Sequence, residues 1–376
     1  MIVKDGAATL GRALASVAPV ADRILVGDTG SRDGSIEVAR AAGAEVIKIP
    51  WEDDFSRARN RVLIEARCDW ILSIDADEML DREGLAKLAA LLARPEVDAY
   101  DVVRWNYEGS ASQRSGENPP QPNPGLLPEA AAFPAYAVSL NTRLFRRAPE
   151  IYFEYRVHET VAGRLDRLGR RRAPADFILH HLGQAEDTEA AREAKNALYH
   201  RLGLKKVAED PNGSAGWFEL GLSTLEYLRR PAEALICFER ARALAPAEPR
   251  NSLFCGICLN AAGAHMRALE RLEEALRGGL RTAVLFEAIG DAYFHTGYYQ
   301  PAHAWYSQSS FSPLTQAKMG ACETMLGQAT MGIEHIRAAI ERAPEFAELN
   351  DILIAATKLA GRIKPDAQSA GLHERA

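Results

Sequence analysis

Cysteine is scarce in this chain, with five residues among 376, and their positions follow no disulfide-like spacing. Such usage is typical of a reducing compartment, so we expect a cytoplasmic protein. Cys255 and Cys258 have the spacing of half a zinc site, but the sequence lacks a second pair. We therefore expect both thiols to pack in a core.

Long apolar runs and an excess of positive charge are also lacking. No stretch approaches the roughly 18–20 apolar residues of a membrane span, and residues 1–6 lack the basic-then-apolar order of a signal peptide. We expect no transmembrane segment and no leader. With 45 basic and 51 acidic residues, the net charge is −6, which gives no general basis for binding nucleic acid.

The order of apolar and amphipathic segments predicts two domains, at residues 1–186 and 187–376. In the first, short apolar runs alternate with amphipathic segments, which indicates an α/β fold with a mainly parallel sheet between helices. The expected strands are 24–26, 45–49, 70–74, 100–105, 142–145 and 177–180, and the expected helices are 7–17, 34–42, 56–66 and 82–92. Residues 109–124, rich in Pro, Gly, Ser and Asn, predict a mobile loop.

The second domain carries a repeat of about 34 residues. Each unit has a glycine followed 12 or 13 residues later by another small residue, and such residues let paired helices approach closely. The pairs are Gly221 and Ala234, Gly256 and Ala268, Gly290 and Ala302, and Gly320 and Gly332. The pattern resembles the tetratricopeptide repeat, which implies an all-α solenoid of four units with a capping helix near 346–359.

Two aspartates with one residue between them, Asp75 and Asp77, follow the apolar run at 70–74. Such a run predicts a buried strand, and open parallel sheets bind ligands at the carboxyl ends of their strands. Alone, this spacing arises by chance about once in a chain this long. Two further acidic segments, residues 27–34 and 50–56, follow neighbouring expected strands, so the three loops should converge at one edge.

Clustered carboxylates are unfavourable unless a cation neutralises them. Mn²⁺ or Mg²⁺ carrying an anionic substrate is the natural candidate. The three loops therefore predict a site for a divalent cation and an anionic substrate.

Several segments resemble the motifs of family 2 glycosyltransferases, which have the GT-A fold. The matching residues are 1–4, 28–35, 54–60 and 75–78 and, shorter, 143–146, 157–159 and 181–183. The later three resemble a subgroup in which tetratricopeptide repeats follow the transferase domain. The resemblance implies an inverting, metal-dependent transfer of sugar from a nucleoside-diphosphate sugar, with UDP expected. The acceptor would be a glycan or a protein, and the repeats could bind a protein partner.

The resemblance also implies residues that bind the nucleotide. Asp28 would accept hydrogen bonds from the base, Lys4 lies in the loop under the base, and Arg59 would steady the nucleotide or its phosphates. The open alternatives are an Asx-turn at Asp28 with a helix N-cap at Asp33, and a solvated Arg59 on its helix.

The implied metal ligand is Asp77, with Asp75 as a metal or ribose contact and His181 as a further metal or pyrophosphate contact. Imidazole suits Mn²⁺ less well than oxygen but is tolerated. A plain polar strand end at the aspartates and a core histidine at His181 are the structural alternatives.

An inverting transfer also requires a base on the acceptor side. Glu159 is our candidate, because Asp77 would be occupied by the metal, and His158 could orient or replace it. As an alternative, Glu159 could form a surface ion pair with Arg143, Arg156 or Arg164.

Two departures from the family pattern concern the N-terminus. The usual first strand starts several residues before the segment at 1–4, so either the start of the sequence is assigned late or the first strand is truncated here. Asp5 and Gly6 stand where Asn-Glu commonly follows the lysine. These departures keep open a second function, a tetratricopeptide scaffold with an inactive transferase domain.

Overall fold

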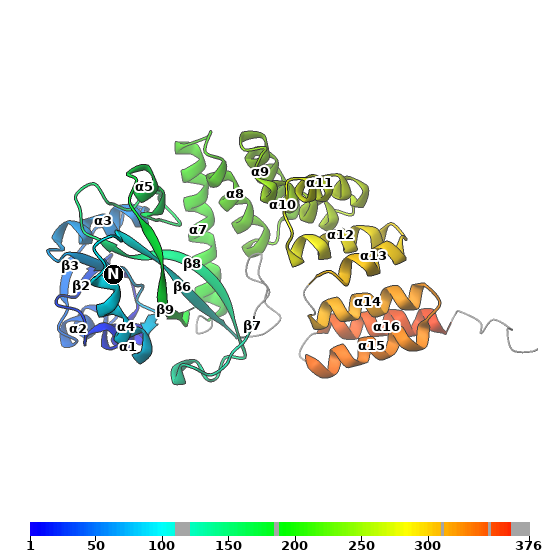
Figure 1. Cartoon of the computed structure of the whole chain (residues 1–376), viewed down its shortest axis with the longest axis horizontal. Helices are drawn as coiled ribbons and strands as arrows, with labels where there is room; N and C mark the ends of the chain where they lie inside the picture. Colours follow the sequence, from blue (N-terminus) through cyan, green and yellow to red (C-terminus); the bar gives the residue numbers. More distant parts are fainter. Residues whose placement is uncertain (110–120, 184–187, 310–311, 345–346, 362–376) are drawn as a thin grey trace, which may run out of the picture. The chain divides into compact units, whose positions relative to one another are not determined.

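The computed structural model describes residues 1–109, 121–183, 188–309, 312–344 and 347–361. Contacts divide the chain into two compact units, residues 1–228 and 229–376, and Figure 1 shows the elements of each. The domain boundary that the sequence predicts after residue 186 remains a prediction. Most of the loop expected at 109–124 lies outside the described residues.

The N-terminal unit begins with a three-stranded parallel sheet in the order β1-β2-β3. Its elements are β1 (Ile2–Val3), α1 (Ala7–Val17), β2 (Leu25–Asp28), α2 (Ser35–Ala41), β3 (Glu45–Lys48) and α3 (Phe55–Glu65). Helix α1 buries Leu10, Ala13, Leu14 and Val17, whose spacing forms one apolar stripe. This stripe explains why the sequence alone predicted α1 with its observed bounds.

A second sheet of six strands follows the path β4-β8-β6-β9-β5, with β7 paired to β8. Its strands are β4 (Trp70–Leu72), β5 (Glu78–Leu80), β6 (Ala99–Glu108), β7 (Gln121–Pro122), β8 (Ala135–Arg146) and β9 (Arg172–His181). The β6–β9 pair is parallel, while β8 runs antiparallel to both β4 and β6. The α/β fold is thus confirmed with a mixed second sheet, which the expected parallel order did not include.

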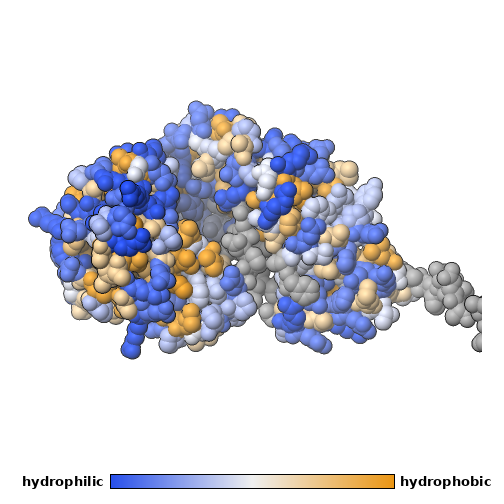
Figure 2. All heavy atoms as spheres, in the orientation of Figure 1, coloured by the Kyte–Doolittle hydropathy of each residue, from blue (hydrophilic) through white to orange (hydrophobic). Residues whose placement is uncertain are grey.

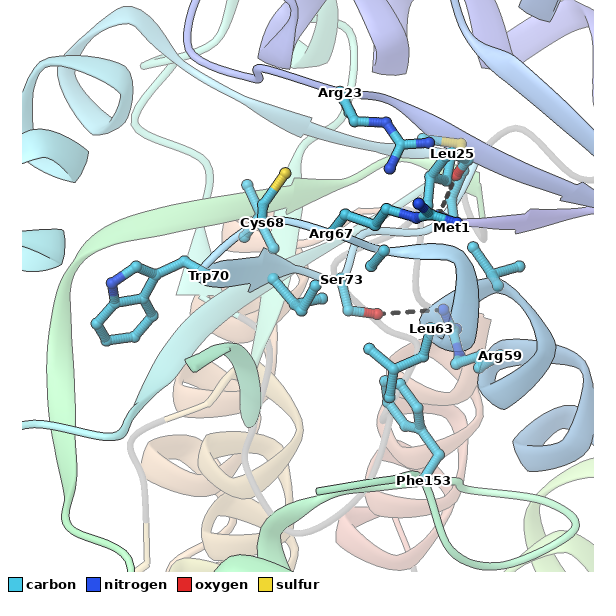
Figure 3. A pocket seen from close by; sticks show the side chains of 14 residues that line it. Met1, Arg23, Leu25, Arg59, Leu63, Arg67, Cys68, Trp70, Ser73 and Phe153 are labelled. Atoms are coloured by element: carbon cyan, nitrogen blue, oxygen red, sulfur yellow. Dashed lines mark hydrogen bonds between the residues drawn. The ribbon is translucent and has the colours of Figure 1, made fainter. Parts of the chain in front are cut away.

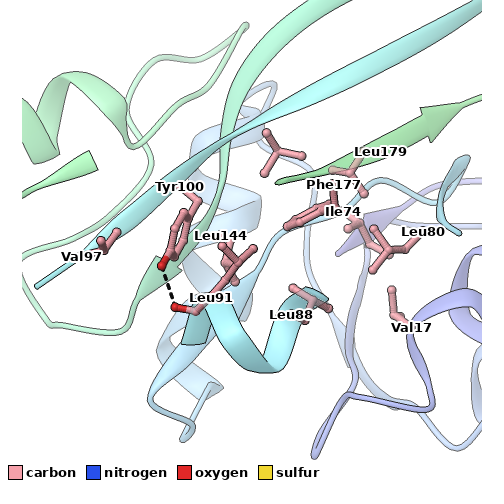
Figure 4. Close-up of a cluster of buried hydrophobic side chains, with 11 residues drawn as sticks. Val17, Ile74, Leu80, Leu88, Leu91, Val97, Tyr100, Leu144, Phe177 and Leu179 are labelled. Carbon is pink, nitrogen blue, oxygen red and sulfur yellow. Dashed lines mark hydrogen bonds between the residues drawn. The ribbon is translucent and has the colours of Figure 1, made fainter. Parts of the chain in front are cut away.

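Helix α4 (Arg82–Leu92) covers the second sheet and helps to form an apolar cluster of this unit. In Figure 4 the Tyr100 side chain lies within the cluster, and its hydroxyl donates a 2.6 Å hydrogen bond to the Leu91 carbonyl. The helix starts at the Asp81 side chain, which accepts from the Gly84 amide. The 3₁₀ turn η1 (Pro128–Ala130) and the short helix α5 (Ala162–Arg167) complete the α/β part.

The described residues of the N-terminal unit also form α7 (Glu189–Glu209), α8 (Ser214–Leu222) and the π-helical turn η2 (Ser223–Tyr227). Ion pairs join α7 to the α/β part. Asp53 accepts from Arg201 at 3.0 Å and from Lys205 at 2.6 Å, and Arg156 pairs with Glu209. Helix α7 is therefore anchored beside the loop that precedes α3.

The C-terminal unit consists of paired helices, as the repeat predicts. They are α9 (Pro231–Leu244), α10 (Pro249–Ala261), α11 (His265–Arg277), α12 (Ala283–His295), α13 (Tyr299–Tyr306), α14 (Pro313–Met325), α15 (Ala329–Arg342) and α16 (Ala347–Ala360). A Cβ at Gly256 would lie 2.5 Å from Leu272, so this glycine permits the close approach of α10 and α11. Cys255 and Cys258 are fully buried on α10, which agrees with packing.

Hydrophilic residues cover most of the face drawn in Figure 2, with hydrophobic residues in small groups. This distribution is ordinary for a protein surface in water. Of the helices in the described part of the chain, none is both long enough and apolar enough to cross a bilayer.

Candidate functional site

A tight turn between β4 and β5 carries the two aspartates. The Asp75 amide donates to Glu78 Oε2 at 2.8 Å, and the Glu78 amide donates back to the Asp75 carbonyl at 3.1 Å. Glu78 is fully buried and starts β5. The turn thus fixes the backbone on both sides of Asp77.

Two arginines hold the Asp75 carboxylate. Arg143 Nη2 donates to Asp75 Oδ2 at 2.8 Å and to Glu78 Oε1 at 2.9 Å, and Arg59 Nη2 donates to Asp75 Oδ1. The β4–β8 pairing brings Arg143 to Asp75, because Leu72 of β4 pairs with Leu144, the residue that follows Arg143 in β8. Burial alone would raise the pKa of Asp75, but the guanidinium groups of Arg143 and Arg59 hold it well below its usual range.

Arg59 also binds Glu159, through Nε to Oε1 at 2.5 Å. Arg59 is 7% exposed, and the Asn60 side chain bonds the backbone of Phe153, which brings the Glu159 loop against α3. The alternatives of a solvated Arg59 and of a surface ion pair of Glu159 with other arginines are therefore wrong. Arg59 instead joins two predicted site carboxylates.

A cavity of about 110 Å³ lies on the other side of Arg59. Figure 3 shows Arg59 and Ser73 meeting at its wall, where Nη1 donates to Ser73 Oγ at 3.4 Å. Trp70, Leu63 and Phe153 also line the cavity, whereas the aspartates do not. The cavity therefore backs the arginine rather than forming the acidic site.

Asp77 lies beside His181, because Glu78 of β5 pairs with His181 of β9. His181 Nε2 is 3.3 Å from Asp77 Oδ2, and Nδ1 is 2.9 Å from Asn106 Oδ1. The Asn106 amide nitrogen donates to Ala137 O, so its Oδ1 faces the histidine and accepts from Nδ1. In a neutral ring, the Nε2 lone pair then faces the Asp77 carboxylate.

This arrangement fits a cation between Asp77 and His181. A ligating histidine commonly donates its other ring N–H to an oxygen, as His181 does. Burial would raise the pKa of Asp77, but positive charge at the His181 position lowers it overall, and a bound cation would act in the same direction. No group of three or more Asp, Glu, His or Cys residues suited to a metal occurs in the part of the chain that the structure describes. One carboxylate plus phosphate oxygens and water is a usual set for Mg²⁺, and Mn²⁺ would also tolerate the imidazole.

Gly183 makes the close approach of Asp77 possible. A Cβ at this position would lie 1.9 Å from Asp77 Oδ2 and 2.9 Å from its Cβ. The Leu182 amide also donates to the Asp77 carbonyl at 3.2 Å. The segment from His181 to Gly183 is therefore shaped around Asp77.

Asp28 ends β2 and is 4% exposed. Its carboxylate accepts from the amides of Gly30 and Ser31 at 3.1 and 3.2 Å, which is an Asx-type turn. Asp33 Oδ1 accepts from the Ser35 amide, but the N-cap of α2 is Gly34. The expected cap at Asp33 is thus wrong by one residue, because α2 starts later than predicted.

Lys4 is exposed in the loop after β1. The amide of Asp5 donates to Ser31 Oγ at 2.9 Å, and its carboxylate accepts from the Arg32 amide at 2.7 Å. The residue that departs from the family pattern therefore ties the Lys4 loop to the turn after Asp28. Strand β1 itself contains two residues.

Helix α7 brings residues to the site that the motifs did not reveal. The Tyr199 ring lies 5.8 Å from Phe55 and 6.0 Å from His158, measured between centroids. Burial raises the pKa of Tyr199, and the charges of Glu159 and Asp75 raise it further, so the phenol stays protonated. Lys195, Tyr199, Leu202 and Lys206 recur every three or four residues, which was the available signal for one shared helical face.

Comparisons with known proteins agree with the fold. Residues 1–148 match the model of the family described as Glycosyl transferase family 2. A TPR repeat-containing protein of Synechococcus elongatus is 38% identical over 161 residues, covering 43% of this chain and 34% of that protein. An uncharacterized glycosyltransferase of Rickettsia felis is 35% identical over 102 residues, covering 27% and 35%.

More distant matches are again a glycosyltransferase and a TPR protein. The glycosyltransferase SunS from a Bacillus subtilis prophage is 25% identical over 161 residues, covering 42% of this chain and 33% of that protein. The matched segments thus span about a third of each of these relatives. A solved TPR protein of Thermus thermophilus aligns with 44% of this chain and 92% of its own, at 19% identity and a TM-score of 0.36. The paired helices of the C-terminal unit support the repeat assignment.

Proposed function

The N-terminal part of this chain is a family 2 glycosyltransferase domain, and from this we propose that the protein transfers a sugar from a UDP-sugar to an acceptor with inversion of the anomeric centre. The observation that carries the proposal is the Asp77–His181 pair beside the arginine-bound Asp75. A carboxylate and an imidazole nitrogen facing each other could hold a cation between them, and that cation would bring an anionic ligand to the site.

Asp77 and His181 would hold the Mn²⁺ or Mg²⁺. The ion would neutralise charge on the departing nucleoside diphosphate. Both oxygens of Asp75 accept from arginines, so its part is to orient Arg59 and Arg143. A direct Asp75–metal or Asp75–ribose contact remains a prediction, for which the carboxylate keeps free acceptor positions beside these two bonds.

Glu159 would accept the proton of the acceptor group. Arg59 binds one of its oxygens, Oε1, so the second oxygen is the one available for that proton. His158, the preceding residue, is exposed and would orient the acceptor or replace Glu159 as base. The guanidinium group of Arg59 pairs with both Glu159 and Asp75, so it links the acceptor side of the proposed site to the donor side.

Asp28 would recognise the nucleotide base. Two backbone amides already bond its carboxylate, but a carboxylate has about four acceptor positions, so it retains capacity for the N–H of uracil. Lys4 is exposed in the neighbouring loop and would contact the solvent-facing side of the nucleotide. Arg59 would act on the phosphates through its bond to Asp75.

The acceptor class, glycan or protein, follows from the family alone. We further propose that the C-terminal repeats bind a protein partner, since stacked helix pairs form extended binding surfaces. The five cysteines are free thiols, which supports the proposed cytoplasmic location.

A panel of UDP-, GDP- and dTDP-sugars, each with and without Mn²⁺, tests the proposal by calorimetric binding and by nucleotide release. We expect Mn²⁺-dependent binding of a UDP-sugar, lost in Asp77→Ala and retained in Asp69→Ala, an exposed aspartate before β4. Binding that survives Asp77→Ala would refute the metal assignment. No binding of any donor would favour the scaffold with an inactive transferase domain.

A further inference from the structure

The loop that carries Glu159 has an unfavourable backbone. Tyr155 has a φ of 75° and His158 a φ of 55°. The left-handed region is unfavourable for residues other than glycine, because Cβ crowds the following carbonyl. Two such residues within four positions persist only when surrounding contacts hold them.

Lys206 of α7 supplies such contacts at the centre of the loop. Its Nζ lies 4.3 Å from the centroid of the Tyr155 ring and donates to the Val157 carbonyl at 3.3 Å. One ammonium group thus binds both the first left-handed residue and the peptide immediately before the second. The cation–π contact and the hydrogen bond both favour the observed turn.

Glu219 of α8 fixes Lys206 in this position. Its Oε2 lies 2.5 Å from Lys206 Nζ, and Lys206 is 7% exposed. A lysine this buried requires a partner, and its ammonium group is compensated by one carboxylate, one carbonyl and one aromatic face. The pair therefore forms a built contact between α7, α8 and the loop.

Other contacts hold the ends of the loop, and at its centre the Arg156 carbonyl accepts from the Phe55 amide at 3.0 Å while the Arg156 guanidinium group donates to the Asp53 carbonyl. Asn60 bonds the backbone of Phe153, and Glu154 pairs with Thr160 as an isolated bridge. These contacts tie the loop to α3 and close its base. Among the described residues, Lys206 is the side chain that bonds the carbonyl of Val157.

We propose that Lys206 is a positioning residue for glycosyl transfer, which holds the turn from Tyr155 to His158 so that Glu159 stays on Arg59 beside the acceptor. The proposal rests on the proposed function for the role of Glu159. It makes α7 and α8 part of the transferase site, although the sequence predicted them within the repeat domain.

The proposal is tested by the rate at which the full chain releases the nucleotide from a UDP-sugar with Mn²⁺. The test variant is Lys206→Met, which keeps the length of the side chain and removes its charge. We expect kcat to fall about 10- to 100-fold with the donor KM little changed, because a displaced base impairs chemistry rather than nucleotide binding. Lys206→Arg should recover part of the loss. Lys205→Met is the matched control, since Lys205 is exposed and binds Asp53 instead, and its kcat should match wild type.

A double-mutant cycle with Glu159→Gln separates positioning from general destabilisation. If Lys206 acts through Glu159, Lys206→Met should reduce kcat little further in the Glu159→Gln background. A full additional loss there, or equal kcat values for Lys206→Met and Lys205→Met, would overturn the proposal.

Hydrogen exchange of the peptide covering residues 153–161 tests the same contact without any donor. We expect faster exchange in Lys206→Met than in wild type, and unchanged exchange in Lys205→Met. If wild type transfers no sugar but this difference appears, the proposed function fails while the structural role of Lys206 stands. Unchanged exchange in Lys206→Met contradicts the role of Lys206 whatever the activity.

Discussion

Replacing Gly183 by alanine should disable the proposed metal-nucleotide site through a single methyl group. The new Cβ would lie 1.9 Å from Asp77 Oδ2, 2.6 Å from Cγ and 2.9 Å from Cβ. Ordinary carbon–oxygen contacts are about 3.3–3.6 Å, so the two groups must separate by about 1.5 Å. Gly183 has no positive φ, so its backbone accepts alanine and the effect comes from this clash.

Side-chain rotation alone does not relieve the clash, because the Cβ of Asp77 is itself too close. The backbone must move, and the Leu182 amide, which bonds the Asp77 carbonyl, opposes that movement. Such overpacking costs about 1–3 kcal/mol of stability. Disturbing the orientation of a metal ligand costs about 10- to 100-fold in affinity, which is the expected loss of Mn²⁺-dependent donor binding.

Calorimetric titration of the UDP-sugar with Mn²⁺ measures that loss, with thermal unfolding recorded in parallel. Asp77→Ala sets the value for complete loss of the ligand. Gly11→Ala, in the interior of α1, is the matched control. The new Cβ would lie 3.5 Å from Val38, which is an ordinary contact distance. There we expect unchanged binding and about 0.5–1 kcal/mol of added stability, since alanine suits a helix interior better.

Wild-type donor affinity in folded Gly183→Ala, together with its loss in Asp77→Ala, would refute the reasoning. It would mean that Asp77 binds the metal from a position other than the one it occupies beside Gly183 and His181.

Three further predictions concern stability. Arg143→Met removes one of the two guanidinium groups on partly exposed Asp75 and an ion-pair partner of fully buried Glu78, and breaking the buried pair should cost about 3–5 kcal/mol in urea unfolding; an unchanged midpoint would contradict this. Neither oxygen of Glu108 has a hydrogen-bond partner among the described residues, and burial raises its pKa from 4.5 to about 7. Folding favours the protonated form of Glu108, so its contribution to the free energy of unfolding is full below pH 4.5. This contribution is lost as the pH rises through 7, and the loss reaches about 3 kcal/mol. Glu108→Gln should flatten this slope between pH 5 and 8, and an identical slope in both proteins would exclude Glu108 as its source. In Gly320→Ala, the new Cβ would lie 2.5 Å from the Gly332 carbonyl. Hydrogen exchange in α14 and α15 should therefore become faster, with a loss of about 1–3 kcal/mol of stability. Unaltered protection from exchange would argue against this close packing.

The sequence predicted the elements whose patterns are local. Helices α1 and α4 have the predicted bounds, since an apolar stripe marks α1 and the Asp81 cap starts α4. The repeat helices followed from their period, because each unit packs only on its neighbours. The family-like motifs also gave the transferase domain, which the match over residues 1–148 supports.

Strands that depend on distant partners were harder to predict. Strand β8 was expected at 142–145 but starts at Ala135, because antiparallel pairing with β6 continues through its polar residues. Strand β5 has three residues and follows directly from the aspartate turn, so it shows no alternation of its own. The antiparallel pairs of the second sheet were therefore absent from the expected topology.

The sequence by itself determined the chemistry available to this protein: the two aspartates, their loop partners, Arg59, and a transferase domain followed by repeats. Only the tertiary structure decided which groups meet. The β4–β8 pairing sets Arg143 on Asp75, and the β5–β9 register sets His181 on Asp77. The docking of α7 brings Lys206 to the Glu159 loop. The physical reason is that these contacts join residues 49 to 104 positions apart, and strand register and helix docking, rather than local spacing, set such distances.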